Sequence, residues 1–585
     1  MKKISIFSMA AATMLLAACA TDDDKNDNGK GGEQGQSKFL AVNIMNVGAT
    51  PTGTRAIDGY EDGTEAESKI NKVRFYFFHA DGSPYYLQNT SDETTSGTNA
   101  NWLETVNDIN GTDKDPDHTV EQITKKVLVI NGISASAPAS VIAVVNPGTL
   151  TSTTLGNEAI NLNTLRQTLT DTKFTNGTGS AAKDFVMSNS VYLDAGSSVC
   201  SSIISGHVAN SAEAALNSPV DIYVERVVAK VQAGLNNAKF VKGNGSNWDA
   251  GKYGIEVGTY GASTKVYAVV DGWGLADEDG KAEIEKQIET SWNSADLGIT
   301  PWTTADYHRS FWSKSVPFTA GDGGNQPVNH TFSYFTSAAT LGDSNESGTP
   351  LYTLPNTPNS VTDFSTPYES YLTKFLVAAH LRYVDDKGNG HNAEICTYKG
   401  VQYLGVENLK TQIANDYNKY YTLTSTGTHE SLKPEELTFS TSSTQGTSLK
   451  DYQVVATLKD TSIKYYVNKG SETDPDWQEV TAATVNKSLE ESPAEVRTDG
   501  MAYYYIPVRH LATDPTKLGY YGIVRNHFYK INLNTIAGFG TPVYDPNKVI
   551  DPTIPSDSNT YLAAEIKVLQ WRVVSQDVDL DKTQK

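Results

Sequence analysis

Beyond residue 37, the apolar segments of this 585-residue chain all have the length of a β-strand, and segments rich in Ser, Thr, Gly and Asn separate them. The segment KVRFYFF, for example, places Val73, Phe75 and Phe77 on one face, and Asp81-Gly82 follows as a turn. Many short strands with loops between them are typical of β-sandwiches. We therefore predict an all-β protein with few short helices.

Three longer patterns refine this prediction. Helical spacing at Leu162, Leu165 and Leu169 predicts a short helix that covers a sheet edge, and the segment 406–417 predicts another helix. The segment 220–233 reads as one long strand, and we expect it to lead from one domain to the next.

The net charge of −21 disfavours two classes of partner. Nucleic-acid binding needs basic stripes, and the sequence has none. Docking on anionic lipid needs a basic face. The acidic residues are spread thinly, which fits a role in solubility.

The N-terminus reads as an export signal. Lys2 and Lys3 precede a short apolar run over residues 4–16, which is too short to span a membrane. Leu16 to Cys19 resembles a bacterial lipobox, in which the thiol takes a lipid anchor. The alternative is an ordinary cleaved signal peptide with a chance cysteine.

An acidic, polar linker follows the cysteine. Asp22 to Asp24 resembles the tag with which Bacteroidota mark lipoproteins for the outer face of the outer membrane. The alternative is a solvated linker with no signal, and residues 20–37 have a linker composition in either case.

The first predicted strand is followed by a loop with an arginine. Leu40, Val42 and Ile44 share one face of this strand, and the loop GATPTGTRAIDG then presents Arg55, the first arginine in the chain. Exposed loops of this kind are preferred sites of proteolysis. A cut between Arg55 and Ala56 would release the lipid, the linker and the strand together.

The C-terminal tail reads as a strand on a stiff linker. The segment 544–559 contains three prolines and cannot be a central strand. In the strand pattern that follows, the apolar residues then change face, which implies a bulge or twist. The first set is Leu562, Ala564, Ile566 and Val568, and the second is Leu569, Trp571 and Val573. The residues support two readings equally: an arm given to a neighbour, or the last strand of its own domain.

These two strands suggest a route to assembly. If the first strand completes a sandwich, its loss leaves unpaired backbone groups, and such an edge binds another strand. The tail of a second copy is a suitable donor. Since donor and groove lie at different places on the molecule, the contact is head-to-tail and grows a filament.

Several segments of the chain resemble the Bacteroidales type V fimbrillins, closest to the major subunit of the short (Mfa-type) fimbriae. They are KINKVRFYFFHADG, VIAVVNPG, FVMSNSVYL, YVERVVAKV, YYYIPVRHL, GYYGIVRNHFYKINLNTIAGFGTPV and EIKVLQWRVVSQDVDL. The similarity is strongest in the C-terminal segments and loose between about residues 280 and 358.

The resemblance implies two transthyretin-like β-sandwich domains with a detachable C-terminal donor strand. Family members are exported as lipoproteins, cut after an arginine, and polymerised by donor-strand exchange into an adhesive pilus. Cys19 matches the lipidated cysteine, and Arg55 the processing arginine. The family's tip subunits lack a detachable C-terminal strand, so its presence here favours a shaft subunit.

The expected domain limits follow from these patterns. They are a signal peptide with lipobox at 1–19, a linker with the removable strand at 20–55, an N-terminal sandwich at 56–225, a C-terminal sandwich at 226–543, and a Pro-rich linker with the donor strand at 544–585.

The partners implied are other copies of the chain, accessory anchor and tip subunits, the outer membrane through the lipid before processing, and surface ligands of a host or another bacterium. We expect no nucleic acid and no cofactor. The location implied is the outer membrane for the precursor and the extracellular fimbrium afterwards.

Signatures of catalysis and of metal binding are missing from the sequence. It contains no HExxH, GxSxG, P-loop or GxGxxG motif in a suitable context, so no enzyme and no metal site are expected. We interpret the segment 385–390 as a polar hairpin turn. Trp273 is expected in a core. The polar residues near two predicted strands are read as structural: Arg509, His510, Arg525 and His527.

Three functions remain open: a polymerising shaft subunit, which the strands and the loop arginine favour; a non-polymerising surface lipoprotein that binds glycan or protein; and a surface hydrolase, which the missing motifs disfavour. Whether Cys200 and Cys396 form a disulfide is also open.

Overall fold

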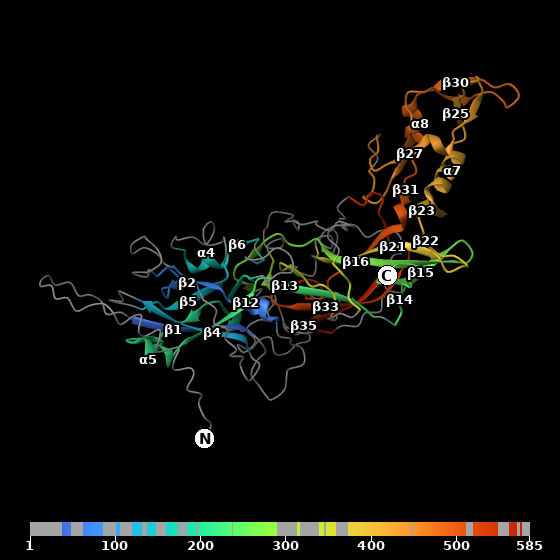
Figure 1. The fold of residues 1–585 in the computed structure, drawn as a ribbon. Helices are drawn as coiled ribbons and strands as arrows, with labels where there is room; N and C mark the ends of the chain where they lie inside the picture. Colours follow the sequence, from blue (N-terminus) through green and yellow to red (C-terminus); the bar gives the residue numbers. More distant parts are fainter. Residues whose placement is uncertain are drawn as a thin grey trace.

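The computed structural model describes residues 38–47, 63–85, 101–105, 120–130, 137–147, 160–171, 173–174, 184–194, 197–236, 238–288, 313–315, 339–343, 347–357, 372–444, 446, 448–510, 519–547, 561–569 and 574–575. Strands dominate these residues, and the helices are few and short. The predicted all-β fold is therefore confirmed. Figure 1 shows an elongated body and a lobe that projects from one end of it.

A nine-stranded sheet forms the end of the body that carries the N-terminal strands, in blue in Figure 1. Its path is β11-β1-β12-β7-β5-β2-β3, with β4 beside β1 and β10 beside β5. The strands are β1 (Lys38–Val47), β2 (Lys72–Phe78), β3 (Asn101–Thr105), β4 (Val120–Ile130), β5 (Ser140–Val145), β7 (Met187–Asn189), β10 (Ser202–Ile203), β11 (Val208–Ala209) and β12 (Val220–Arg226). In β2, six consecutive residues are buried, so both faces of this strand are covered.

The segment 220–233 is two strands and not one. β12 ends at Arg226 in the nine-stranded sheet, and β13 (Ala229–Leu235) begins a different, five-stranded sheet. The buried pair Val227 and Val228 lies between them. The apolar pattern continues through this junction because both sides of it are buried, which is why the sequence reads as one strand.

Two sheets pack against each other in the rest of the body. The first has the order β20-β13-β33-β35-β36, and the second β14-β15-β16-β21-β32-β34 with β22 beside β21. Their remaining strands are β14 (Val241–Lys242), β15 (Tyr253–Tyr260), β16 (Thr264–Ala276), β20 (Leu351–Thr353), β21 (Lys374–Val384), β22 (Gly390–Asn392), β32 (Met501–Pro507), β33 (Phe528–Ala537), β34 (Thr541–Pro542), β35 (Tyr561–Leu569) and β36 (Val574–Ser575). Val231 and Ile531 of the first sheet share a core with Val266 and Val377 of the second, as in a β-sandwich. Trp273 is fully buried in this core, as predicted.

Short helices and short strands complete the body. The helices are α2 (Glu65–Ser68), α4 (Leu162–Arg166) and α5 (Ala212–Leu216), and the short strands are β6 (Leu169–Thr170), β8 (Tyr192–Asp194), β9 (Ser197–Val199), β17 (Ala282–Glu283), β18 (Gln287–Ile288) and β19 (Ser313–Lys314). The helix predicted around Leu165 is present but ends before Leu169, because Leu169 pairs with Glu283 in a ladder between β6 and β17.

The projecting lobe has a hydrophobic core of its own, which the sequence did not separate from the body. This core runs from Cys396 to Val496 along the chain and includes Leu409, Ile413 and Tyr465. The elements are β23 (Ile395–Tyr398), β24 (Val401–Leu404), α7 (Val406–Asp416), β25 (Tyr420–Leu423), β26 (His429–Ser431), η5 (Pro434–Glu436), β27 (Leu437–Ser440), β28 (Val455–Leu458), β29 (Tyr465–Asn468), β30 (Trp477–Val480), α8 (Ala482–Leu489) and β31 (Ala494–Val496); η6 (Thr498–Gly500) then leads back to the body. Helix α7 is the helix predicted over 406–417.

Arg497 joins the lobe to the body. Its side chain is buried, and Nε donates a hydrogen bond to the carbonyl of Phe539 at 2.9 Å, while Nη2 donates to that of Gly540 at 2.7 Å. Nη1 donates to the carbonyl of Ile395 in β23 at 3.2 Å. One guanidinium thus binds both parts, and burial lowers its pKa from the ordinary value.

We predict that Arg497→Met loosens the lobe, since three buried carbonyls lose their donor at about 1–3 kcal/mol each. Hydrogen exchange in β23 and β31 is expected to accelerate while exchange in β16 stays unchanged. Arg509→Met is the control, because Arg509 lies over the Tyr520 ring in the body. Equal exchange in the lobes of both variants would contradict this role.

Candidate functional site

The two terminal strands singled out by the sequence, β1 and β35, both lie in sheets of the structure. β1 contains Leu40, Val42 and Ile44, and Leu40 is fully buried. β35 contains the tail residues Leu562, Ala564, Ile566, Val568 and Leu569. Cys19, Arg55, Ala56, Trp571 and Val573 lie outside the described residues.

β1 has β4 on one edge and both β11 and β12 on the other, so it joins these strands into one sheet. It pairs antiparallel with β4 along its whole length, from Lys38 opposite Ile130 to Val47 opposite Val120. On its other edge, Phe39 and Leu40 pair with β11, and residues 42–46 pair in parallel with β12. Among the described residues, β4 pairs with β1 alone. Without β1, the facing edges of β4 and β12 would both be unpaired.

Strand β12, which pairs with β1, has one buried, apolar face. Val220, Ile222 and Val224 are at most 2% exposed, and they pair with Val42, Ile44 and Asn46 of β1. Asp221 is exposed and Tyr223 half-buried. This alternation selects a strand whose apolar residues stand in the same register as those of β1.

Helix α5 packs against both β1 and β4. It begins after Ser211, whose side chain accepts a hydrogen bond from the backbone of Ala214 at 3.1 Å, and its Ala215 is fully buried. The side of the sheet beneath the first strand is therefore covered by a capped helical turn.

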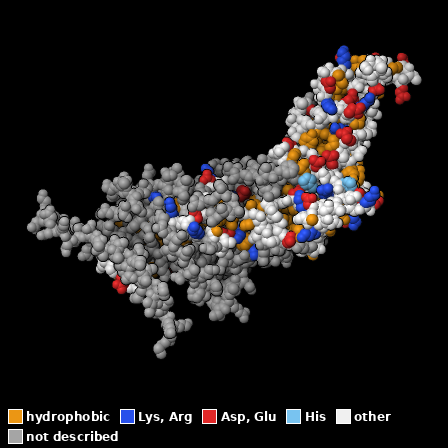
Figure 2. All heavy atoms as spheres, viewed as in Figure 1, with side chains coloured by type: hydrophobic (Ala, Val, Ile, Leu, Met, Phe, Trp, Pro, Cys, Tyr) orange, Lys and Arg blue, Asp and Glu red, His pale blue; other side chains and the backbone are white. Residues whose placement is uncertain are grey.

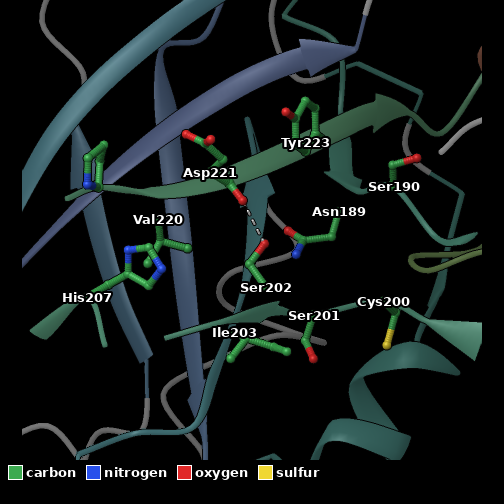
Figure 3. A pocket seen from close by; sticks show the side chains of 11 residues that line it. Asn189, Ser190, Cys200, Ser201, Ser202, Ile203, His207, Val220, Asp221 and Tyr223 are labelled. Carbon is green, nitrogen blue, oxygen red and sulfur yellow. Dashed lines mark hydrogen bonds between the residues drawn. The ribbon is translucent and has the colours of Figure 1, made fainter. Parts of the chain in front are cut away.

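A cavity of about 310 Å³ lies beside β12. Figure 3 shows its lining, which mixes Val220 and Ile203 with polar side chains that include Asn189 and His207. The Ser202 hydroxyl donates to the carbonyl of Asp221 at 3.1 Å across it. Because Val220 is also the ladder partner of Val42, the cavity adjoins the β1 ladder.

β35 pairs antiparallel with β33 of its own chain, from Tyr561 opposite Ala537 to Leu569 opposite Phe528. The register shifts between Leu533 and Thr535. β33 presents Tyr529, Ile531 and Leu533, all fully buried. Of the two readings that the sequence left open, this chain on its own adopts the folded-back one.

A buried polar cluster, which we call the α2 clamp, holds the chain directly after the loop that contains Arg55. It consists of Glu67, Arg226, Lys230, Tyr352 and Asn526. The Glu67 carboxylate lies 2.9 Å from Lys230 Nζ and accepts from the Tyr352 hydroxyl at 2.5 Å. Arg226 donates from Nε to the Glu67 carbonyl at 2.8 Å and from Nη1 to Asn526 Oδ1 at 3.0 Å. The clamp thus joins α2 to β12, β13 and β20 and to the residues before β33.

Electrostatics keep the clamp charged. Burial raises the pKa of Glu67, but the charges of Lys230 and Arg226 and the hydrogen bond from Tyr352 outweigh it, so that the pKa lies below its ordinary value. Sequence reasoning missed this cluster. The capping box of α2, formed by Thr64 and Glu67, is the one local signal of it.

Of the four polar residues that the sequence assigned to structure, His510, Arg525 and His527 are buried, whereas Arg509 is half-buried. Arg525 donates to the carbonyl of Ile284 at 2.8 Å, and His510 Nδ1 contacts the Tyr529 hydroxyl at 2.9 Å. His527 is 1% exposed, and its Nδ1 lies 2.8 Å from the Arg525 carbonyl oxygen. The segment 385–390 is a hairpin turn in which Asp385 accepts from the backbones of Lys387 and Asn389.

Cys200 and Cys396 are free and buried. Burial raises the pKa of each thiol to about 12, so both are protonated at neutral pH. Within the described ranges, no group of His, Cys, Asp and Glu could hold a metal ion. In the same ranges, no helix combines the length and the apolar character needed to cross a bilayer.

Comparison with known proteins gives one family match. Residues 497–577 match the family model described as "Major fimbrial subunit protein type IV, Fimbrillin, C-terminal". This segment begins at Arg497 and ends two residues after β36, so it contains both β33 and β35. A comparison with curated protein sequences found no match.

Three solved structures illustrate the similarity in chain path. A fimbrilin (fimA) from Porphyromonas gingivalis W83 is 14% identical at a TM-score of 0.35, with 93% of this chain and 99% of that one covered. The tip fimbrial protein Mfa3 from Porphyromonas gingivalis, with a C-terminal truncation, is 9% identical at 0.31, with 92% and 100% covered. A fimbrial assembly protein from Parabacteroides distasonis ATCC 8503 is 8% identical at 0.27, with 93% and 100% covered.

Proposed function

We propose that this chain, whose residues 497–577 match the family model of a major fimbrial subunit, is a shaft subunit of an adhesive surface fimbria. In this proposal the precursor is exported as a lipoprotein anchored through Cys19. It is then cut after Arg55, and it polymerises when β35 of one copy replaces the lost β1 of the next.

The similarity of β1 and β35 carries this proposal. The segment 39–47 reads FLAVNIMNV, and β35 reads YLAAEIKVL over its 9 residues. Aligned in the same direction, both begin with an aromatic residue and share three identities. The identical pairs are Leu40 with Leu562, Ala41 with Ala563, and Ile44 with Ile566. A strand in the place of β1 with this register offers β12 an isoleucine opposite Ile222, as β1 does.

The position of the processing loop supports release of β1 alone. Arg55 lies between β1, which ends at Val47, and α2, which begins at Glu65. The α2 clamp holds Glu67 and Ser68 by contacts that β1 does not share, among them the bond from Arg226 Nη2 to the Ser68 hydroxyl at 3.3 Å. A cut after Arg55 therefore separates the removable strand from a chain that stays attached on the other side.

The expected energies are sufficient for a durable joint. A strand of this length buries several hundred Å² of apolar surface, worth roughly 10 kcal/mol gross at about 25 cal/mol per Å². Association and ordering remove part of this. The persistence of the joint would then depend on slow unfolding of the sheet edge.

The wider proposal follows the predicted partners. The precursor is held on the outer membrane by its lipid, and the processed chain joins other copies together with accessory anchor and tip subunits in an extracellular fimbrium. Adhesion to host or bacterial surfaces is the expected role, and no catalytic activity is proposed.

A second function is favoured by one observation, the ladder between β33 and β35 of the same chain. A surface lipoprotein that keeps its lipid and its first strand would use β35 as its own last strand. Such a protein would bind glycan or a protein partner without polymerising.

Mass and N-terminal sequence of protein sheared from cells distinguish the two. We expect an unlipidated chain that begins at Ala56 and runs as an SDS-resistant ladder. Arg55→Ala should leave a lipid-bearing monomer, and Lys69→Ala is the matched control in the same region. A wild-type chain that begins at Cys19 with its lipid and runs as a monomer would replace the shaft subunit with the binding lipoprotein.

A further inference from the structure

The outer end of the lobe carries four aromatic side chains on the solvent side of a sheet. The sheet has the order β26-β25-β29-β30. Its inner face packs in the lobe core through Tyr420 and Tyr465, which are 5% and 1% exposed. The next residues along β25 and β29 point the other way, since side chains alternate along a strand. We define the tip aromatic cluster as Tyr421, His429, Tyr466 and Trp477.

The four rings touch one another across the sheet. His429 and Trp477 come from the two edge strands, and their rings stack with centroids 4.0 Å apart at 6°. Edge strands of a flat four-stranded sheet are about 14 Å apart, so both side chains reach over the two central strands. Trp477 meets Tyr421 edge-on at 4.7 Å, and His429 meets Tyr466 edge-on at 4.7 Å. The result is a continuous aromatic surface.

This surface is open to solvent. All four residues of the tip aromatic cluster are half-buried, and Leu423 beside them is 47% exposed. The rings can therefore be contacted from the solvent side of the sheet.

The size and charge of the surface decide the class of ligand. Four rings and one leucine are far less than the roughly 800 Å² per partner of a stable protein interface. The adjacent charges, Lys464 and Glu479, neutralise each other at 2.6 Å and are 66% and 54% exposed. A small, neutral, amphipathic ligand fits this setting. A sugar ring has an apolar face that stacks on aromatic rings and a rim of hydroxyls.

The place of the cluster also fits a binding role. In Figure 1, β25 and β30 lie at the far end of the lobe, away from β1 and β35. Figure 2 shows hydrophobic and charged side chains mixed over the exposed surface of the lobe. A ligand here would not compete with either terminal strand.

We propose that the tip aromatic cluster binds a neutral sugar unit of a surface glycan. Trp477 and His429 provide the stacking surface, and the rings of Tyr421 and Tyr466 meet it edge-on. A single sugar would bind weakly, and a polymer that repeats the lobe would raise the effective affinity by multivalency. The site itself belongs to the monomer, so it stands or falls independently of the proposed polymerisation.

The test uses the purified, unprocessed chain as a monomer. Lactose, cellobiose, mannobiose and chitobiose are the probes, and saturation-transfer NMR measures binding. We expect at least one of them to bind, and Trp477→Ala to weaken it about tenfold or more through the lost stacking. Trp477→Phe should retain part of the affinity. Sialylated lactose should bind no better than lactose, because the adjacent Lys464 is already paired with Glu479.

Tyr383→Ala is the matched control. It removes one ring of a comparable stack, that of Tyr383 on His391 with centroids 5.0 Å apart, in the body and not in the lobe. Its sugar binding should equal that of the parent chain. Far-UV circular dichroism checks the fold, and His429→Ala serves as a second variant that leaves Trp477 over the sheet. Binding of none of the four sugars, or full binding by both cluster variants, would overturn the proposal.

A glycoprotein distinguishes sugar from protein as the ligand. Asialofetuin is expected to bind the chain before, and not after, enzymatic removal of its glycans. If asialofetuin binds equally well after deglycosylation, and if this binding is lost in Trp477→Ala, the cluster binds a protein surface and the glycan proposal is rejected.

Discussion

A chain that carries Ile566→Asp is expected to be cut after Arg55 like the parent chain and to form no SDS-resistant polymer. In the register that aligns β35 with β1, Ile566 takes the place of Ile44, opposite Ile222 of β12, which is fully buried. An unpaired carboxylate in such a place costs several kcal/mol, or is neutralised at a similar cost. Gel electrophoresis of unheated samples and electron microscopy measure the loss.

Lys567→Asp is the matched control, because it changes the charge more but sits at the position of Met45, opposite the half-buried Tyr223. It should polymerise. Mixing the Ile566→Asp chain with the parent chain tests whether only the donor strand is defective. The Ile566→Asp chain keeps an intact groove, so it should accept a donor strand from the parent chain. Because it donates no strand itself, it should end the growing polymer and make it shorter. Ladders of parent length from the Ile566→Asp chain alone would reject the proposed register.

The strands of the body were predictable, and so was helix α7, because alternation and helical spacing are local properties of the sequence. The segment 374–384 contains an apolar run of strand length and forms β21. The division between sheets at Val227 and Val228 was not visible, since a strand buried on both faces reads as a continuous apolar run. The lobe was missed for a related reason: its strands look like those of the body, and a separate core depends on which strands pack together.

The candidate site was predictable only as far as its residues are local. Leu40, Val42 and Ile44 fall in β1 as expected, whereas the α2 clamp joins residues 159, 285 and 300 positions apart. No periodicity records such separations. The tail shows a different limit. Its apolar pattern suits both the edge of β33 and the place of β1, so the pattern predicts a strand and cannot choose its partner.

A buried ion pair lies near the end of β12. Lys286 Nζ lies 2.9 Å from the Glu225 carboxylate, and both side chains are fully buried. Burial raises the pKa of the neighbouring Glu285 carboxyl well above its ordinary value. Glu225 is the carboxylate that contacts Lys286. Arg525 Nε is farther from Glu225, at 3.9 Å.

Lys286→Met is therefore expected to lower the free energy of unfolding by about 3–5 kcal/mol. This is the usual effect of removing one partner of a buried ion pair, because the other charge stays buried without its counter-charge. Lys265→Met is the control: its partner Glu256 is at 2.8 Å, but the two side chains are 60% and 43% exposed, so the loss of stability should be much smaller. Calorimetry of the first unfolding transition measures both.

Because Glu225 lies near the end of β12, the strand that faces β1, a loosened pair should also weaken the groove that receives β35. We therefore expect Lys286→Met to form less polymer than the parent chain at temperatures below its unfolding transition. Lys265→Met should form a normal amount of polymer. Equal transition temperatures for the two variants would show that Glu225 is adequately served by Arg525 alone.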